Sequence, residues 1–127
     1  MLSKKMEYGY LILKKMEKLN SNEMITGKKF LEELAVPKGV GLRILTELSS
    51  AGLIGSEKGM WGGFYKKERR ITMLDLFIAL ERDLNYAQLK REDKSFREIK
   101  LEIGTKLLEA LKNIEIYNFK KIKNGKN

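Results

Sequence analysis

The stretch Gly59-Met60-Trp61-Gly62-Gly63-Phe64-Tyr65 decides how this chain is interpreted, and it directly follows Ala51-Gly52-Leu53-Ile54-Gly55-Ser56-Glu57-Lys58. Glycine permits positive φ angles and close backbone approach, so a glycine-rich turn between two short apolar runs indicates a β-hairpin. We expect its strands at residues 53–56 and 64–67. Met60 and Trp61 then lie at the tip of this hairpin.

Two helices are predicted ahead of the hairpin. The first covers residues 4–19, where apolar side chains recur at helical spacing as a stripe of Tyr8, Leu11, Ile12 and Leu19. Asn20-Ser21-Asn22 ends this helix with turn-forming residues. Thr26 stands where an N-cap is expected, before a second helical run that carries Phe30, Leu31 and Leu34.

A third helix is predicted after Val36-Pro37, because proline suits the first turn of a helix. We expect it to start near Pro37 and to end at Ala51-Gly52, with Gly52 as the C-cap. Its inward-facing residues are expected to be Val40, Ile44, Leu45 and Leu48. Two short helices around a tight break, followed by a hairpin, form the pattern of a winged helix-turn-helix.

The chain continues with two further predicted helices. One opens at residues 71–75, where Thr72 and Asp75 resemble a capping box. Residues 85–95 are polar without periodicity and are interpreted as a linker, a long helix is expected at 96–122, and a basic tail follows at 123–127. The predicted organisation is mainly α with a small β-wing: a winged helix-turn-helix domain at residues 1–84 and a long C-terminal dimerisation helix.

In the long helix, apolar residues recur in alternating steps of three and four, which places them on one stripe. A small winged domain cannot bury such a stripe completely, so we expect it to pair with a second copy in a homodimer. The alternative is that this helix folds back over the first helix. The expected dimer contacts are Phe96, Ile99, Ile103, Leu107, Leu111 and Ile114.

The composition favours a polyanionic partner. The chain of 127 residues has 26 Lys and Arg against 17 Asp and Glu, a formal net charge of +9, although a Lys-rich genome produces the same bias. Without Cys or His, the chain cannot form disulfides or thiolate and imidazole metal sites, and an enzyme is not expected. The chain has no 18-residue apolar run and no secretory signal pattern, so we expect a cytoplasmic protein without membrane contact.

The second helix of a helix-turn-helix places its N-terminal residues on base edges in the major groove. Lys38, Val40 and Arg43 occupy those positions here, with a merely solvated face as the alternative. Because Gly39 and Gly41 offer no side chain, we expect phosphate contacts and the wing to supply more of the affinity. The expected DNA contacts are Thr26, Lys28, Lys29, Lys38, Val40, Arg43, Lys58, Trp61, Lys66 and Lys67, with a partner protein as the alternative contact for Trp61.

These motifs resemble those of the Rrf2 family of bacterial winged-helix regulators. The family's first helix carries a tyrosine–alanine pair, here Tyr8-Gly9, and its recognition helix runs into the pattern seen at residues 51–54. The helix after the wing matches residues 71–81. The wing pattern is matched by Ser56, Gly59, Gly62, Gly63 and Phe64. The resemblance extends over nearly the whole chain and implies a DNA-binding transcriptional regulator with a long dimerisation helix.

The chain departs from the family pattern in three places. Cluster-binding members carry three cysteines between the fourth helix and the dimerisation helix, whereas residues 84–95 contain none, which implies a member without an iron–sulfur cofactor. Gly41 replaces the leucine usual in the middle of the recognition helix, which implies altered DNA specificity. Met60 and Trp61 replace small or basic residues at the wing tip.

The predicted function is that of a homodimeric regulator, a repressor of the Rrf2 type, which binds double-stranded DNA and has no cofactor. The sequence leaves room for a small-molecule effector at the junction of wing, linker and dimerisation helix. The alternative function is a winged-helix adaptor that docks a partner protein and has weak or lost DNA specificity. The aromatic wing tip is the main sign in favour of this alternative.

Overall fold

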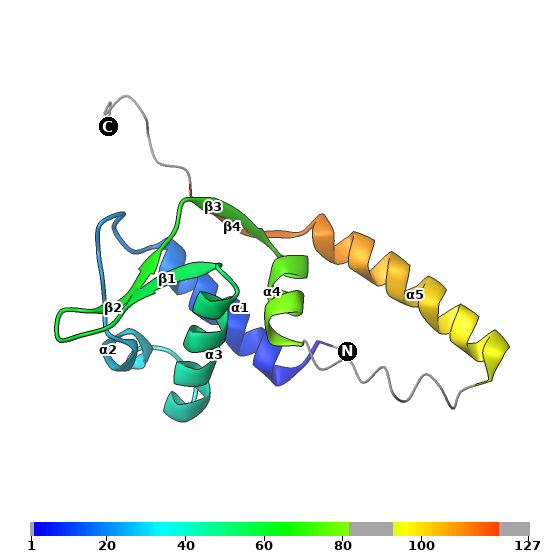
Figure 1. Ribbon diagram of the computed structural model, residues 1–127, viewed down its shortest axis with the longest axis horizontal. Helices are drawn as coiled ribbons and strands as arrows, with labels where there is room; N and C mark the ends of the chain where they lie inside the picture. Colours follow the sequence, from blue (N-terminus) through cyan, green and yellow to red (C-terminus); the bar gives the residue numbers. More distant parts are fainter. Residues whose placement is uncertain (1, 82–92, 120–127) are drawn as a thin grey trace, which may run out of the picture.

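The computed structural model describes residues 2–81 and 93–119 (Figure 1). The helices are α1 (Lys4–Glu17), α2 (Gly27–Leu31), α3 (Lys38–Ser50), α4 (Met73–Leu80) and α5 (Lys94–Lys112). The strands are β1 (Ile54–Glu57), β2 (Gly63–Lys66), β3 (Arg69–Thr72) and β4 (Glu115–Phe119). The fold is therefore mainly helical with a small antiparallel wing, as predicted, and β3 and β4 form a second antiparallel pair. The basic tail and most of the predicted linker lie outside the described residues.

Helix α1 is central to the domain, because α3, α4 and β4 all pack against it. Its buried face consists of Met6, Gly9, Ile12, Leu13 and Met16. Of the predicted stripe, Ile12 is buried, and Tyr8 and Leu19 are half-buried and pack against the core. The prediction is wrong for Leu11, which is half-buried and is not part of this packing. Apolar residues surround much of this helix, so spacing alone did not define a single inward face.

The glycine of the Tyr8-Gly9 pair lies where α4 crosses α1. A Cβ at Gly9 would lie 2.7 Å from Leu80 Cδ1 and 2.8 Å from Leu76 Cδ1. Glycine therefore permits the two helices to approach each other closely at this crossing.

The helix-turn-helix of α2 and α3 follows the predicted local signals. Thr26 Oγ1 accepts a hydrogen bond from the Lys29 N–H at 3.3 Å, and α3 begins directly after Pro37. Gly52 follows the helix with a φ of 78°, the left-handed conformation of a C-terminal glycine. Ile44, Leu45 and Leu48 are buried as predicted, but Val40 is 39% exposed and does not face the core.

Gly41 is buried where α3 packs against α2, so it does not remove a side chain from the exposed face of α3. A Cβ there would lie 2.8 Å from Leu31 Cδ1 and 3.2 Å from Val36 Cγ1. At Gly39, by contrast, a Cβ would meet nothing within 4 Å. The expectation that both glycines remove base-reading positions is therefore wrong for Gly41, whose side of the helix belongs to the core.

The C-terminal helix is shorter than predicted. Helix α5 begins at Lys94, with Asp93 as its N-cap, and ends at Lys112. Residues 94–95 are therefore helical, the expected helix at 96–122 is wrong for residues 113–119, and residues 120–122 lie outside the described residues. Residues 115–119 instead form β4, which pairs with β3. The sequence Ile114-Glu115-Ile116-Tyr117-Asn118-Phe119 is rich in β-branched and aromatic residues, which favour strands, and β4 supplies hydrogen-bond partners to β3.

Strand β4 belongs to the core of the winged domain. Tyr117 is fully buried, and its hydroxyl donates a hydrogen bond to the Lys67 carbonyl oxygen at 3.1 Å. Burial raises the pKa of the Tyr117 phenol, so the phenol stays protonated and serves as a donor. The predicted boundary at residue 84 is therefore wrong, because a strand from beyond α5 completes the domain.

Glu17 connects the end of α1 to β4. Burial alone would raise the pKa of its carboxyl group. Hydrogen bonds from Lys14 Nζ at 3.0 Å and from the Asn118 N–H at 3.2 Å outweigh this effect, and with the nearby Lys66 they lower the pKa. The carboxylate is thus ionised at neutral pH and holds the two elements together. Within the described residues, no helix combines the length and the apolar character needed to cross a membrane.

Replacing Tyr117 by Ala should destabilise the domain by about 3–5 kcal/mol, because it removes a buried aromatic ring from the core. Urea unfolding followed by circular dichroism measures the change. Asn118→Ala is the matched control in the same strand, since its side chain is exposed and should change stability by less than about 0.5 kcal/mol. Equal stability of the two variants would contradict the packing of β4.

Gly41→Leu and Gly39→Ala should shift stability in opposite directions. Leucine at position 41 overpacks the contact with Leu31 and should cost about 1–3 kcal/mol. Alanine at the open position 39 should stabilise α3 by about 0.5–1 kcal/mol through its higher helix propensity. Thermal and urea unfolding test both changes, and a Gly41→Leu protein as stable as the parent would refute the buried placement.

Candidate nucleic-acid interface

One short backbone contact brings the start of α2 beside the wing. The Ile25 N–H donates to the Phe64 carbonyl oxygen at 3.0 Å, and the Phe64 N–H donates back to Ile25 at 2.8 Å. Gly27 lies beneath this contact, where a Cβ would be 2.6 Å from Leu42 Cδ2 and 3.1 Å from Phe64 Cε2. The first turn of α2, the middle of α3 and strand β2 therefore meet at one point, and their exposed residues share one side of the domain.

The exposed face of α3 is centred on Arg43. Arg43 and Lys38 are both exposed, and Val40 lies at the edge of this face. Three residues that the sequence interpretation did not select also lie there: Leu42, Thr46 and Ser50. Thr46 and Ser50 recur at helical spacing from Arg43, which is the signal that could have identified them. This face offers one guanidinium group, one ammonium group and two hydroxyl groups to a partner.

Cationic side chains flank this face on two elements. Lys28 and Lys29 are exposed in the first turn of α2, directly after the capping residue Thr26. Lys58 and Trp61 are exposed in the turn between β1 and β2, with Trp61 89% accessible. Eight of the ten residues predicted to contact DNA are thus exposed at the start of α2, on α3 or on the wing: Thr26, Lys28, Lys29, Lys38, Val40, Arg43, Lys58 and Trp61.

The two remaining predicted residues lie behind the wing. Lys66 Nζ donates to the Glu17 carbonyl oxygen at 3.1 Å and lies 4.2 Å from the centre of the Phe119 ring. This lysine supports the contact between α1, the wing and β4, so its placement among the expected DNA contacts is revised. Lys67 is exposed beside it, and its carbonyl group accepts the Tyr117 hydroxyl.

The arginines that follow the wing also interact within the fold. Arg69 Nη2 lies 3.6 Å from Asp75 Oδ2, and its Nη1 donates to the Gly52 carbonyl oxygen. Arg70 Nε pairs with Glu115 Oε1 at 3.2 Å, which joins β3 to β4. The positive charge behind the wing therefore contributes to the tertiary structure.

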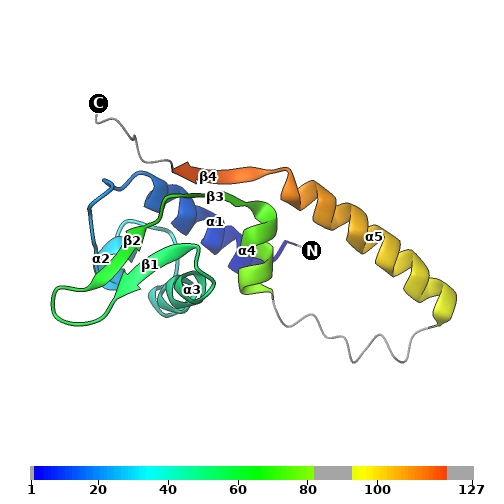
Figure 2. The same cartoon turned by 45° about the horizontal axis from the view of Figure 1, so that its top comes forward.

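Helix α5 projects from the domain as an arm, and within the described residues it packs mainly against α4 (Figure 2). Phe96, Ile99 and Ile103 are 55–56% exposed, so half of the six predicted stripe residues are uncovered on the helix within one chain, and Leu107 is half-buried. Leu101 and Leu108 add exposed apolar surface that the sequence interpretation did not select. Leu111 lies in α5 but is buried within its own chain, and Ile114 lies beyond the helix end, so neither belongs to the exposed part of the helical stripe.

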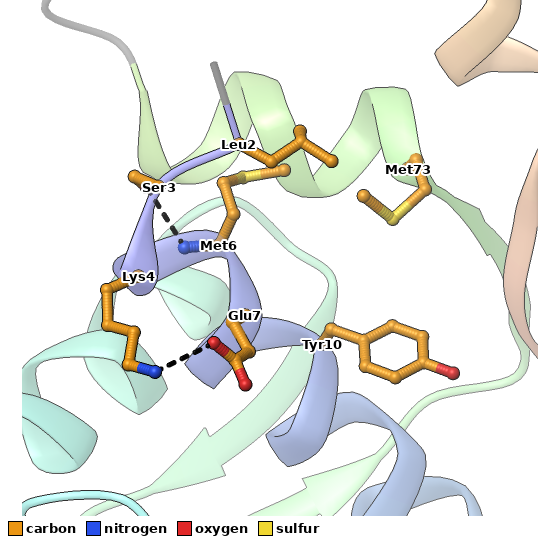
Figure 3. Close-up of a pocket in the computed structure, with 7 residues that line it drawn as sticks. All are labelled: Leu2, Ser3, Lys4, Met6, Glu7, Tyr10 and Met73. Carbon is orange, nitrogen blue, oxygen red and sulfur yellow. Dashed lines mark hydrogen bonds and ion pairs between the residues drawn. The ribbon is translucent and has the colours of Figure 1, made fainter.

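A surface pocket lies between the N-terminal turn of α1 and the start of α4 (Figure 3). It is lined by Leu2, Ser3, Lys4, Met6, Glu7, Tyr10 and Met73. In Figure 3, Lys4 and Glu7 form an ion pair at one side, with a separation of 3.1 Å. The predicted effector site was instead at the junction of wing, linker and dimerisation helix, and most of that linker lies outside the described residues.

Metal-ligating side chains are scarce. The chain contains neither Cys nor His, and no group of three or more Asp or Glu side chains in residues 2–81 and 93–119 is arranged to hold a metal ion. The donors needed for an iron–sulfur cluster are therefore missing.

The fold is similar to several solved structures. T. potens IscR has a TM-score of 0.68 and 19% identity, covering 91% of this chain and 82% of that one. CymR (YrzC), the global cysteine regulator of B. subtilis, has a TM-score of 0.66 and 23% identity, covering 91% of this chain and 92% of that one. The oxidised form of Staphylococcus aureus CymR has a TM-score of 0.62 and 23% identity over the same shares. At these identities the likeness establishes the winged-helix fold.

Family membership follows from the sequence. No curated protein matches the chain. A family model described as "Rrf2: Iron-dependent Transcriptional regulator" matches residues 2–121, nearly the whole chain. The chain therefore belongs to the Rrf2 family, whose members are transcriptional regulators rather than enzymes.

Proposed function

We propose that this Rrf2 protein is a homodimeric repressor that binds double-stranded DNA and acts in the cytoplasm. The observation that carries the proposal is the exposed Arg43 face of α3 beside the cationic first turn of α2 and the wing. A helix of 13 residues is about 20 Å long and fits the major groove. Bound at its operator, such a protein would block transcription by occupying the promoter.

Each part of the interface would have a different role. Arg43 can donate two hydrogen bonds to a guanine edge, and Thr46 can contact a neighbouring base or phosphate. Lys28, Lys29 and Lys58 would neutralise phosphates, which positions the protein without reading the sequence. Binding should then weaken steeply as salt rises, because each neutralised phosphate releases counterions.

Dimerisation would come from α5. The arm has 19 residues and is about 28 Å long, and its stripe of Phe96, Ile99 and Ile103 is more than half exposed within one chain. Pairing two such arms around a two-fold axis buries both stripes and gives a closed assembly. Two α3 helices would then enter major grooves about 34 Å apart on one face of the DNA.

The iron dependence in the family description does not fit the donor chemistry of this chain. Iron–sulfur clusters are held by cysteine thiolates, with histidine as the usual replacement, and the chain has neither. We therefore propose that DNA binding here requires no iron–sulfur cluster. A regulator of this kind would respond to another signal, to a partner protein or to its own concentration.

The roles of Arg43 and of the α2 lysines can be separated by anisotropy titrations on a labelled duplex that the protein selects from a random library. Arg43→Ala should weaken binding to this duplex by about 1–3 kcal/mol and reduce discrimination against a scrambled duplex. Lys28→Ala and Lys29→Ala should weaken binding to both duplexes alike, each lowering the salt slope by about 1.

Lys112→Ala, which removes the same charge from the exposed end of α5, is the control and should bind like the parent protein. An Arg43→Ala protein with unchanged affinity and unchanged discrimination would contradict the proposed role of α3. Failure of the parent protein to select any duplex would contradict DNA-binding regulation and favour the adaptor alternative.

The dimer is tested by placing like charges on the α5 stripe. The double variant Ile99→Glu, Ile103→Glu should sediment as a 14.7 kDa monomer, whereas the parent should sediment at twice that mass. Thr105→Glu is the control, because residue 105 lies on the opposite side of the same helix. A parent protein that is monomeric at micromolar concentration, or a double variant that stays dimeric, would overturn the arm as the dimer contact.

A further inference from the structure

The wing tip exposes two large apolar side chains next to each other. Met60 is 86% exposed and Trp61 is 89% exposed, while no other large apolar side chain in residues 2–81 and 93–119 exceeds 59%. Lone exposed apolar residues are common, but an adjacent pair at the end of a hairpin gains nothing for the fold. These two side chains are therefore free to contact a partner.

The backbone of the tip holds this pair in a fixed direction. Strands β1 and β2 pair from Ile54–Lys66 to Glu57–Gly63, and the Gly62 N–H closes the turn on the Gly59 carbonyl oxygen at 3.1 Å. A Cβ at Gly62 would lie 2.1 Å from the Glu57 carbonyl oxygen, so the turn has no room for a side chain at this position. Phe64, the second residue of β2 after the turn, is joined to Ile25 by two backbone hydrogen bonds, which fix the tip relative to α2 and α3.

The surroundings of the tip favour an anionic partner. Lys58 is exposed in the same turn, and Lys28 and Lys29 are exposed on the neighbouring start of α2. Glu57 is the acidic residue of the hairpin, at the end of β1. The glycines at positions 59 and 62 have no side chains, so the narrow tip presents mainly Met60 and Trp61 to a partner.

We propose that Met60 and Trp61 form an apolar wedge that enters the minor groove and inserts at a base step, an inference that rests on the proposed DNA-binding function. Apolar side chains of architectural proteins insert between base pairs in this way and bend the duplex by roughly 20–90°. The indole ring can stack on an unstacked base whatever its identity. The fixed hairpin and the flanking lysines provide the two further requirements, a set direction and contact with the adjacent phosphates.

The wedge adds sequence preference without base-specific hydrogen bonds. Pyrimidine–purine steps such as TA and CA unstack and kink most easily, so the wedge selects sites with such a step at a fixed distance from the major-groove contacts of α3. This selection supplements the few polar groups on the exposed face of α3, which are one guanidinium, one ammonium and two hydroxyl groups.

The chain contains a single tryptophan, so its fluorescence reports on the wing tip alone. When the selected duplex is added, Trp61 emission should be quenched and shifted to the blue, and quenching by acrylamide should fall several-fold. 2-Aminopurine placed at a TA step in the flank of the duplex should brighten as the wedge unstacks it. Anisotropy of a fluorescein-labelled copy of the same duplex measures total binding independently of the tryptophan.

Variants test whether the insertion contributes to binding and bending. The double variant Met60→Ala, Trp61→Ala should bind the selected duplex about tenfold more weakly or worse, and energy transfer between dyes on the two DNA ends should show a smaller bend. Trp61→Phe should keep most of the affinity and the bend, because phenylalanine also serves as a wedge. All three proteins should unfold at the same urea concentration, since both side chains are exposed.

Two outcomes overturn the wedge and can be told apart. If the labelled duplex binds but Trp61 emission and acrylamide access do not change, and the double variant binds equally well, the wedge is refuted while the proposed function stands. The tip would then be free for a protein partner, as the adaptor alternative holds. If no duplex binds at all, the wedge and the proposed function fail together.

Discussion

The antiparallel pairing of β3 with β4 determines how the rest of the molecule is arranged. It joins the segment after the wing to the segment after α5. Two side-chain interactions stabilise this pairing: the Arg70–Glu115 ion pair, between residues 45 positions apart, and the Tyr117–Lys67 hydrogen bond, between residues 50 positions apart. The Met73 N–H also donates to the Ile114 carbonyl oxygen at 2.8 Å, so the first residue of α4 is held by the same connection. The root of α5 is therefore fixed to the winged domain, and any assembly through the arm would set the separation of two α3 helices.

Local signals account for most of what the sequence predicts correctly. The Thr26 cap, the reciprocal capping box of Thr72 and Asp75, and the left-handed Gly52 each involve residues within a few positions of one another. Such interactions depend on residues that are close in the sequence, so the spacing of those residues predicts them. The same holds for the wing, whose turn closes between Gly59 and Gly62.

The predictions that fail depend on tertiary packing, which sequence spacing does not show. Residues 114–117 continue a helical spacing from α5, but β3 offers them hydrogen bonds that a longer helix would leave unmade. Lys66 looks like an exposed wing lysine until Glu17 and Phe119 are placed against it. From the sequence alone, Gly41 is interpreted as a missing side chain on the DNA-contacting face of its helix. The tertiary fold shows instead that Leu31 and Val36 fill the space beside it. Sequence spacing predicts whether a residue lies in a helix or a strand. Which face of that helix or strand is buried depends on the elements that pack against it in the tertiary fold.

The late position of β4 in the sequence has a consequence for how the protein is made. During translation, β3 is synthesised well before its partner strand, with Arg70 and Glu115 separated by 45 residues. At roughly 5–20 residues per second, the edge of β3 stays open for several seconds while α4 and α5 emerge from the ribosome. A nascent winged domain can form its wing and its helix-turn-helix in that interval, but it lacks the Tyr117 side chain that completes its core. Completion of the winged domain is thus coupled to synthesis of the arm. A chain interrupted within α5 would lack part of the arm and also strand β4, which completes the core of the domain.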